Sequence, residues 1–381
     1  MHLVDTTVFH SPTSGGVRRY LEAKHAWLTA HTSVRHSLVV PGDCYRFVPG
    51  GFTTLPGRIV PGTFNYRLPL NPRLWSRTLE ALEPDLIEVG DAFHPAWCAW
   101  RVAQRRGIPA VAFYHSDLAR LIGRRMGHRM EEATRRYLRW LYGHFDAVLA
   151  PSRLMRDYLL SLGIARAVFQ PLGVDADVFH PARRRTDLRR ELGLSADTRL
   201  LVFAGRFSRE KNIPILLQAF AKLGSPYHLL LIGGDRDARV AANVTMVPFR
   251  RDSRELASWL ASCDALVHAG TKETFGLVVV EAMACGRPVV GARAGAIPEI
   301  IDRSVGELAE PLDAASLAEA IATLYARDLD ALGAAARAKV LEHFTWSQAL
   351  QVQLATYASI AGARRIPLTA HPVAELRSPT P

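Results

Sequence analysis

The amino-acid sequence predicts an α/β protein of two doubly wound domains, in which helices cover both faces of a mostly parallel sheet. Its length of 381 residues exceeds one ordinary domain and fits two. Hydrophobic residues make up 49% and charged residues 22%, the composition of a globular protein with sizeable cores. Short apolar segments also alternate with longer helical patterns in two series along the chain, and this alternation is typical of parallel sheets.

The first series predicts an N-terminal domain over residues 1–168. A Gly-Gly turn follows the first apolar segment, and a helix is expected from about Val17. Further helices are expected at 96–106 and 130–145. The expected strands are 2–7, 37–40, 86–89, 110–114 and 147–150.

The second series predicts a C-terminal domain over residues 169–345. The segment 171–185 has two prolines and a basic run, which predicts a linker between the domains. From about Ala314 the chain is helical and alanine-rich through Ala361, and residues 363–381, with four prolines and no periodic pattern, are expected to be disordered. Strands are expected at 200–203, 228–232, 245–247, 265–268 and 288–292, and helices at 213–223 and 277–284.

The net charge of +11 is concentrated in the first half of the chain. Residues 1–165 hold 21 basic and 13 acidic side chains, and ten arginines lie between 101 and 139. Such a basic stretch suits an anionic membrane, a nucleic acid or an acidic substrate, and a solvated helix face explains it equally well. The start of the chain lacks a secretory signal, no run of about 20 apolar residues occurs, and the four cysteines form no CxxC pair. We therefore expect a cytoplasmic protein with reduced thiols.

The most specific motif is KETFGLVVVEAMACGRPVV, residues 272–290. Glu273 and Glu281 stand eight residues apart, and the segment Thr274-Phe275-Gly276 predicts a loop before a helix that starts at Leu277. A helix start exposes free N–H groups that suit an anion or a sugar hydroxyl. Eight residues make slightly over two turns, so both carboxylates are expected on one face, where they could accept hydrogen bonds from paired hydroxyls.

A second motif is VFAGRFSREKN, residues 202–212. An apolar strand ends at Gly205, and Arg206 and Lys211 then bracket a short loop before a helix. Ligands bind at the carboxyl ends of strands in open α/β sheets, and two cations there suit a diphosphate. An exposed basic loop is the structural alternative.

Two weaker signals follow strands of the first half. Gly15-Gly16 could let the backbone approach a phosphate at the next helix start, although a plain tight turn is the commoner case. His115 and Asp117 follow a predicted strand at the ligand-binding edge, where a single histidine is more often structural.

Taken together, these residues resemble the retaining glycosyltransferases of family 4, which have the GT-B fold of two Rossmann-like domains facing a central cleft. The resemblance spans residues 1–360 and is stronger in the second half. It also implies that a C-terminal helix, 346–362, returns to the N-terminal domain. The matching features occur in the family's order: Gly15-Gly16, His115, the GRFSREKN loop at 205–212, LLLIGGD at 229–235, and the two-glutamate motif.

The resemblance also implies roles for individual residues. Arg206 and Lys211 would hold the donor diphosphate, and Glu281 would accept hydrogen bonds from the ribose hydroxyls. Glu273 and the backbone of residues 275–277 would contact the donor sugar. Gly16 would offer an amide to the phosphate, and His115 would lie near the reacting face of the sugar. The catalytic set implied is therefore His115, Arg206, Lys211 and Glu273, and the donor-binding set also includes Gly15, Gly16, Gly205, Phe275, Gly276, Leu277 and Glu281.

The implied reaction needs neither a protein nucleophile nor a cofactor. Front-face attack with retention of configuration would depend on positioning and on charge stabilisation by Arg206 and Lys211, so no metal is expected. Three DxD matches, at 175–177, 235–237 and 328–330, are interpreted as chance.

The sequence therefore predicts a hexosyltransferase, with mannose favoured, that uses a GDP-mannose or UDP-hexose donor in cell-envelope glycoconjugate synthesis. The acceptor would be a lipid-linked sugar or a polysaccharide. A same-fold sugar-nucleotide epimerase and a basic nucleic-acid-binding protein are the alternatives, and the second is disfavoured because no recognition helix, zinc spacing or interleaved aromatics occur. Apolar residues at helical spacing between the arginines of 118–130 leave open either peripheral binding at the inner face of the membrane or packing into the core.

Overall fold

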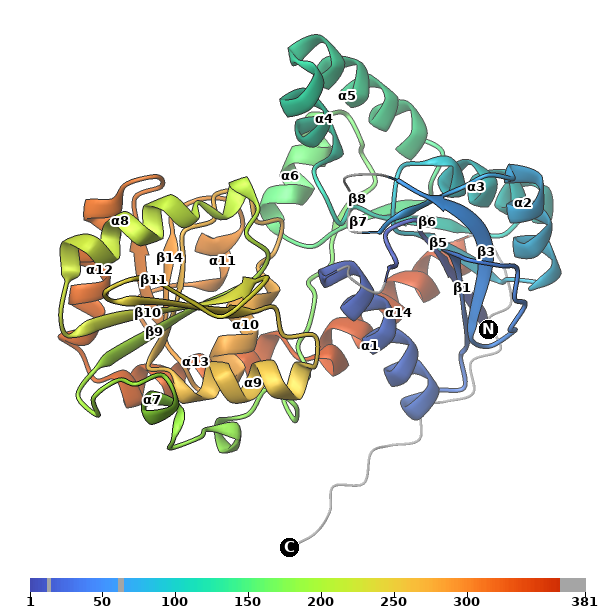
Figure 1. Ribbon diagram of the computed structural model, residues 1–381. Coiled ribbons are helices and arrows are strands. Elements are labelled where there is room, and N and C mark those ends of the chain that lie inside the picture. The colour runs from blue at the N-terminus through green and yellow to red at the C-terminus, as the bar shows by residue number, and fades with distance from the viewer. Residues whose placement is uncertain (12–14, 61–64, 364–381) are drawn as a thin grey trace, which may run out of the picture. The chain divides into compact units, whose positions relative to one another are not determined.

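The computed structural model of the chain describes residues 1–11, 15–60 and 65–363, which form two compact units (Figure 1). The N-terminal unit comprises the described residues of 1–151, 155–170 and 350–363. The C-terminal unit comprises residues 152–154 and 171–349. The expectation of a disordered tail concerns residues that lie, beyond 363, outside the described part of the chain.

Within the described residues, the N-terminal unit is built on an eight-stranded sheet in the order β4-β3-β2-β1-β5-β6-β7-β8. Neighbouring strands are parallel, except that β4 is antiparallel to β3. The strands are β1 (His2–Thr6), β2 (Arg35–Gly42), β3 (Phe52–Ile59), β4 (Arg67–Pro69), β5 (Leu86–Val89), β6 (Ala110–Phe113), β7 (Ala147–Ala150) and β8 (Ala167–Phe169). The helices are α1 (Gly16–His31), α2 (Pro72–Ala81), α3 (His94–Arg106), α4 (Leu118–Met126), α5 (His128–Tyr142), α6 (Arg153–Ser161) and α14 (Trp346–Ala363).

Local sequence explains these boundaries. The central strands β5 and β7 are buried along their whole length, as expected of strands covered on both faces. Helix α3 ends at Gly107, whose φ of 69° is the left-handed conformation that favours glycine. Asp117 caps α4 by accepting a hydrogen bond from the Arg120 N–H at 3.2 Å. Gly127, with φ of 88°, separates α4 from α5, and the two helices project from the sheet (Figure 1).

The C-terminal unit has a sheet in the order β11-β12-β10-β9-β13-β14-β15, parallel except for the β11–β12 pair. Its strands are β9 (Arg199–Ala204), β10 (Tyr227–Gly234), β11 (Ala238–Ala241), β12 (Val244–Pro248), β13 (Ala265–His268), β14 (Val289–Ala292) and β15 (Gly306–Ala309). Its helices are η1 (Pro181–Arg183), α7 (Leu188–Glu191), η2 (Arg209–Lys211), α8 (Ile213–Leu223), α9 (Ser253–Ser262), α10 (Leu277–Ala284), α11 (Ile297–Ile300), α12 (Ala314–Tyr325) and α13 (Leu329–His343).

Each sheet has a point where its strand order reverses. In the N-terminal unit the chain moves outward from β1 through β2, β3 and β4, and then returns to β5 on the other side of β1. In the C-terminal unit β9 has β10 on one side and β13 on the other. Loops that leave the carboxyl ends of such strands diverge and leave a crevice, so ligands of open α/β sheets bind there.

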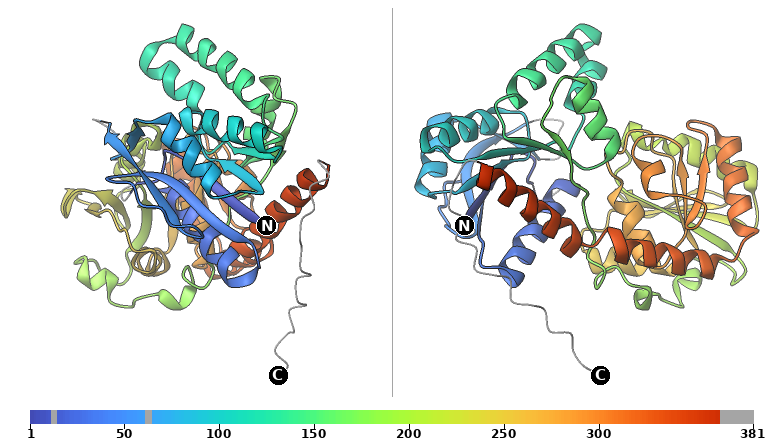
Figure 2. Two further views of the ribbon diagram at one scale, coloured as in Figure 1. Left: turned by 90° about the vertical axis from the view of Figure 1, so that its right-hand side faces the viewer. Right: turned by 180° about the vertical axis from the view of Figure 1, so that it is seen from behind.

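The last helix, α14, packs in the N-terminal unit beside α1 (Figure 2). The Tyr357 hydroxyl of α14 lies 3.0 Å from the Lys24 Nζ of α1. The helices of the described residues include none that is long and apolar enough to cross a membrane. Of the four free cysteines, Cys44 is exposed and the other three are buried.

Candidate functional site

The two strongest sequence motifs meet at the switch point of the C-terminal sheet. Residues 205–212 leave the carboxyl end of β9, and residues 269–276 leave the carboxyl end of the neighbouring β13. Asn212 ties the loops together, because its side-chain amide donates to the Ala269 carbonyl at 2.8 Å. The site is therefore held by side chains as well as by the sheet beneath it.

A carboxylate between two nitrogen groups forms the centre of this site. Glu273 Oε1 pairs with Lys211 Nζ and lies 3.1 Å from the Nε2 of His268, which is fully buried at the end of β13. The Gly270 N–H donates to His268 Nδ1 at 3.2 Å, so a neutral imidazole carries its proton on Nε2, the nitrogen that faces Glu273. Burial by itself raises the pKa of Glu273, but Lys211 and His268 outweigh it and hold the pKa well below its ordinary value. The carboxylate is therefore ionised, and both partners fix its orientation.

Glycine is required where the backbone of the Arg206 loop is supported. The Gly205 N–H donates to the Ile232 carbonyl of β10 at 2.9 Å. Gly233 follows in β10 with a φ of +148°, and a Cβ there would lie 1.8 Å from the Gly205 carbonyl oxygen. Because Gly205 immediately precedes Arg206, this close backbone contact fixes the point from which the Arg206 side chain starts.

The loop after Glu273 leads directly into α10. Gly276, with φ of 108°, precedes the helix, and Leu277 is its first residue. The Phe275 side chain is buried against Phe344, so only its backbone is available to a ligand. The Val279 N–H donates to the Gly276 carbonyl at 2.9 Å. The N–H groups of the first two helical residues have no carbonyl of the helix to bond, and with the helix dipole they favour an anion or a hydroxyl oxygen.

Glu281 lies in the second turn of α10 and is 3% exposed. The structure thus places Glu273 in the loop before the helix and Glu281 inside the helix. The Glu273 carboxylate faces Lys211 and His268.

In the N-terminal unit, the two glycine candidates start helix α1. Gly15 is the N-cap of α1 and Gly16 its first residue, and a Cβ added at Gly15 would meet no atom within 4 Å. Glycine is therefore not required at position 15 by packing within the described residues. The helix start leaves N–H groups that could bind a phosphate oxygen.

His115 follows β6 and is enclosed by aromatic rings. Its ring stacks on Phe113 at 4.1 Å with an interplanar angle of 2°, and the Tyr20 ring lies 5.0 Å away. Burial, followed by the nearby Lys24 ammonium, lowers the pKa of His115 to about 3, so the imidazole is neutral at physiological pH. A neutral imidazole can donate one hydrogen bond and accept another, but it is a weak general base.

Two residues of the site were not predicted from the sequence, namely His268 and Asn212. The signal for His268 was a histidine at the last position of an apolar strand, two residues before a glycine. A Cβ at Gly270 would lie 2.4 Å from the His268 ring, so that glycine makes room for the imidazole. The signal for Asn212 was an asparagine just before a helix, where it adopts φ of 53°, a conformation that asparagine tolerates.

In two of the three DxD matches, the first aspartate accepts hydrogen bonds from backbone N–H groups that follow it. Asp175 accepts the N–H groups of Asp177 and Val178 at 3.0 Å, and Asp328 caps α13 by accepting those of Asp330 and Ala331. Across residues 1–11, 15–60 and 65–363, no group of three or more His, Cys, Asp and Glu side chains is placed to hold a metal ion.

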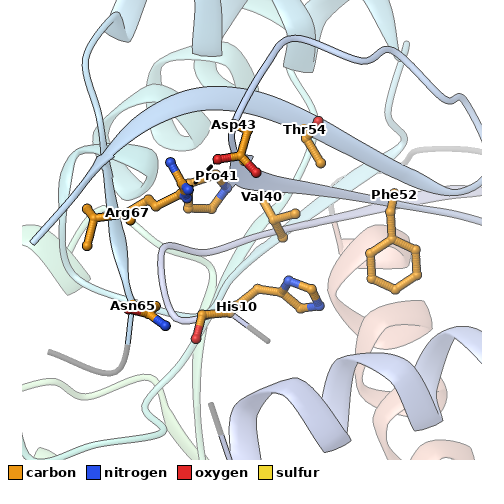
Figure 3. Close-up of a pocket in the computed structure, with 11 residues that line it drawn as sticks. His10, Val40, Pro41, Asp43, Phe52, Thr54, Asn65 and Arg67 are labelled. Atoms are coloured by element: carbon orange, nitrogen blue, oxygen red, sulfur yellow. Dashed lines mark hydrogen bonds and ion pairs between the residues drawn. The ribbon is translucent and has the colours of Figure 1, made fainter. Parts of the chain in front are cut away.

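The N-terminal unit also has a cavity of about 380 Å³ at the carboxyl end of β2 (Figure 3). Its walls combine apolar side chains with groups that can bind hydroxyls, and two of the lining residues, Arg67 and Asp43, form an ion pair. Burial and then Arg18 lower the pKa of His10, which also lines the cavity, to about 4. The lining residues are His10, Ser11, Val40, Pro41, Gly42, Asp43, Phe52, Thr54, Ile59, Asn65 and Arg67.

The basic stretch of the N-terminal unit is divided between core and surface. Leu118 is buried and Ile122 packs against the core. The side chains of Leu121, Met126 and Met130 are 53%, 63% and 39% exposed. The surrounding arginines are exposed as well: Arg120, Arg124, Arg125 and Arg129. The expected core packing is therefore present for Leu118 and Ile122 but not for Leu121, Met126 and Met130, and peripheral membrane binding stays a prediction.

Comparison with known proteins extends this description. The family model described as Glycosyltransferase Family 4 matches residues 14–178, and the model described as Glycosyl transferases group 1 matches residues 198–327. A GDP-mannose-dependent alpha-(1-6)-phosphatidylinositol dimannoside mannosyltransferase of Mycobacterium tuberculosis is 31% identical over 379 residues, covering 96% of this chain and 98% of the relative. A GDP-mannose-dependent alpha-mannosyltransferase of Corynebacterium glutamicum is 30% identical over 312 residues, covering 79% and 75%.

Solved structures agree on the fold. The sucrose-phosphate synthase of Thermosynechococcus elongatus has a TM-score of 0.77 at 23% identity and covers 95% of this chain and 99% of its own. The Anabaena protein HepE in complex with UDP and glucose has a TM-score of 0.71 at 19% identity, covering 93% and 99%. These likenesses confirm the predicted GT-B fold class of two mostly parallel sheets.

Proposed function

This chain is a glycosyltransferase of family 4, and on that basis we propose that it transfers mannose from GDP-mannose to a hydroxyl of a lipid-linked or polysaccharide acceptor, with retention of configuration, in cell-envelope glycoconjugate synthesis. The observation that carries the donor assignment is the pair of relatives named as GDP-mannose-dependent mannosyltransferases, one of them aligned over 96% of the chain. HepE was solved with UDP, but at 19% identity it supports the fold alone. A UDP-hexose donor is therefore the second candidate.

The proposed donor site is the switch point of the C-terminal sheet. Arg206 and Lys211 supply two cations to the diphosphate, and the first turn of α10 adds backbone N–H groups. Before the donor binds, the Lys211 ammonium is paired with Glu273, so it is already held near the place where the leaving group develops charge. Glu281 is proposed to accept hydrogen bonds from the ribose.

Glu273 is proposed to have a second task, toward the sugar. Its Oε1 is shared by Lys211 and His268, which leaves other lone pairs of an ionised carboxylate for the sugar hydroxyls. His115 is proposed to contact the donor sugar as a neutral hydrogen-bonding group, in keeping with its low pKa. Neither residue acts as a nucleophile in this proposal.

The transfer is proposed to proceed by front-face attack. The bond between the anomeric carbon and the diphosphate oxygen breaks as the acceptor oxygen approaches on the same face, and the leaving phosphate takes the acceptor proton. The protein contributes positioning and charge stabilisation. Because Arg206 and Lys211 already supply positive charge, the proposal includes no divalent metal.

A donor-binding assay and two variants test this proposal. We expect the unfolding temperature to rise with GDP and GDP-mannose, and less with UDP or ADP, in the presence of EDTA, because a ligand at a hundredfold excess over its Kd adds about 2.7 kcal/mol of stability. Arg206→Ala should lose about 10²–10³ in kcat, the scale for one preorganised donor, and Arg206→Lys should lose less. A preference for UDP would support the second candidate, and no response to any nucleotide would refute the donor site. NMR of the product would decide the anomeric configuration.

The acceptor is proposed to bind in the N-terminal unit, where the 380 Å³ cavity combines hydroxyl-binding groups with apolar walls. Arg67→Ala should then raise the KM for the acceptor and leave the Kd of GDP unchanged. An unchanged acceptor KM would exclude the cavity from acceptor binding.

We also propose that α4 and α5 bind an anionic membrane surface. Leu121, Met126 and Met130 are exposed beside four exposed arginines, a combination that suits an interfacial helix pair. We expect the protein to sediment with vesicles containing phosphatidylglycerol at low salt. The variant Leu121→Gln/Met126→Gln should weaken that binding, whereas Leu160→Gln, equally conservative at a 43% exposed position on α6, should not. Equal binding of all three proteins, or none by the wild type, would refute the membrane surface.

A further inference from the structure

A network of buried charges lies between the central strands of the N-terminal sheet and helix α1. Asp5 of β1 and Glu88 of β5 are direct partners in the sheet register. The Lys24 ammonium of α1 lies 2.8 Å from Asp5 Oδ2 and 3.0 Å from Glu88 Oε1. Each of the three residues is at most 2% exposed. His36, on β2, adds a ring nitrogen 3.3 Å from Asp5 Oδ2.

Helix α14 completes this network. The Tyr357 hydroxyl lies 3.0 Å from Lys24 Nζ and also bonds Glu88. The Gln353 amide donates to Glu88 Oε2 at 3.0 Å and to the Tyr20 hydroxyl at 2.6 Å. Tyr20 in turn donates to Glu88 Oε1 at 2.8 Å. Two side chains from the end of the chain therefore fix groups on its first helix.

Burial and ionic pairing act in opposite directions on the pKa values of the two carboxylates in the network. Burial raises the pKa of Asp5, but Lys24 and then His36 outweigh it, and the net pKa lies below the ordinary value. Burial raises the pKa of Glu88 above its ordinary value, although Lys24 opposes this. Apolar residues could fill such a space with equal or greater stability, so a buried ionic network is weak as a stability device and better suited to fixing a geometry.

The geometry that this network fixes includes His115. The Tyr20 ring lies 5.0 Å from both the His115 and the Phe113 rings, so it closes the side of the stacked pair. On another side, a Cβ at Gly90 would lie 3.5 Å from His115 Cδ2. The imidazole is thus confined by Phe113, Tyr20 and the backbone after β5.

We infer that Tyr20 is a positioning residue for His115. Glu88 and the Gln353 amide of α14 hold the Tyr20 side chain, and the Tyr20 ring in turn sets the orientation of the His115 imidazole. This inference rests on the proposed function, because it gives the orientation of His115 a role in transfer. The Tyr20 hydroxyl is anchored at two points, and its ring then holds the imidazole in one orientation. Helix α14 therefore affects the orientation of His115 through one side chain of α1, that of Tyr20.

The test compares Tyr20→Phe with a matched control. Tyr20→Phe keeps the ring and removes the anchored hydroxyl. Tyr325→Phe removes a tyrosine-to-carboxylate hydrogen bond of the same kind in the C-terminal unit, where Tyr325 donates to Asp264 at 3.0 Å. Gln353→Met is a second variant, which removes the α14 donor and leaves Tyr20 intact. Unfolding temperatures establish that each variant is folded.

The first readout is NMR of ring-labelled histidines, with the His115 signals assigned through His115→Gln. We expect Tyr20→Phe and Gln353→Met to shift or broaden the His115 ring resonances and Tyr325→Phe to leave them unchanged. This readout needs no substrate, so it tests the positioning even if the proposed reaction is wrong. Unchanged His115 resonances in both variants would overturn the inference.

The second readout separates binding from turnover. With GDP-mannose as donor, we expect kcat to fall at least tenfold in Tyr20→Phe and Gln353→Met, while the Kd of GDP stays within twofold, because the diphosphate groups are held in the C-terminal unit. If neither the wild type nor any variant transfers mannose, the proposed function fails. The NMR result still decides whether Tyr20 positions His115. Wild-type kcat in both variants, despite shifted resonances, would show that the positioning has no role in transfer.

Discussion

Replacing Gly233 by alanine tests how the C-terminal sheet supports the Arg206 loop. The added Cβ would lie 1.8 Å from the Gly205 carbonyl oxygen and 2.9 Å from its carbon. Cβ atoms in proteins keep at least 3.0 Å from such atoms, so the two backbones must separate by about 1.2 Å, the difference between 3.0 and 1.8. Both contacts are to backbone, so no side-chain rotation can relieve them.

The size of the effect follows from that displacement. A misplacement of about 1 Å in a catalytic group costs about 10²-fold in rate, which corresponds to about 2.7 kcal/mol of transition-state stabilisation. Arg206 immediately follows the displaced Gly205, so we expect kcat/KM to fall about 100-fold. The overpacked contact should also lower the free energy of unfolding by about 1–3 kcal/mol.

Initial rates with GDP-mannose and urea unfolding would measure the two effects, with Gly193→Ala as the control. Gly193 also has a positive φ, +67°, but a Cβ there would meet nothing within 4 Å. The control should therefore lose about 1 kcal/mol of stability through backbone strain and keep its activity. If Gly233→Ala retained kcat/KM within twofold of the control, the claim that this contact fixes the Arg206 loop would be wrong.

Three further predictions concern the C-terminal unit. Gly270→Ala should displace the buried His268 ring, which the new Cβ would approach to 2.4 Å, and should reduce transfer more than it reduces the affinity for GDP in calorimetric titration. Glu273→Gln removes the negative charge from Lys211, so it should tighten GDP binding by about tenfold, or 1.4 kcal/mol, while lowering kcat; weaker GDP binding would contradict the assigned pairing. Burial, followed by Arg239, lowers the pKa of His228 to about 4, so the unfolded chain takes up a proton near pH 6.5 that the folded chain does not. The free energy of unfolding should then fall as the pH drops from 6.5 to 4, by up to about 3 kcal/mol from this group, and His228→Gln should flatten that part of a series of urea titrations.

The central strands could be predicted from the sequence because a short apolar run by itself indicates a buried strand. Residues 86–89, 147–150 and 265–268 were predicted with the bounds that the structure has. The four edge strands β4, β8, β11 and β15 were missed, and so was β3, which pairs with β4. They are short or contain proline and glycine, and they exist through pairing with a neighbour that the local sequence does not specify.

The residues of the candidate site likewise fall into some that were predicted from the sequence and some that were missed. The cations of the 205–212 loop and Glu273 were predicted because their motifs are local in sequence. His268 was missed because a histidine in an apolar strand has no distinguishing pattern, and its role arises only when Glu273 and Gly270 fold around it. The network around Lys24 was missed for a stronger reason: its members come from β1, α1, β2, β5 and α14, and bonded partners are up to 333 residues apart.

That separation has a consequence for the order in which the protein is made. Lys24 leaves the ribosome long before Tyr357, and at about 5–20 residues per second the delay is roughly 17–67 seconds. During that interval the nascent N-terminal unit lacks the two α14 side chains, Gln353 and Tyr357, that bond Glu88 Oε2. All strands of the C-terminal unit, in contrast, are synthesised before α14. We expect the continuous C-terminal unit to reach its native state first, and a fragment ending at residue 170 to stay incompletely folded until a peptide with the α14 sequence is supplied in trans.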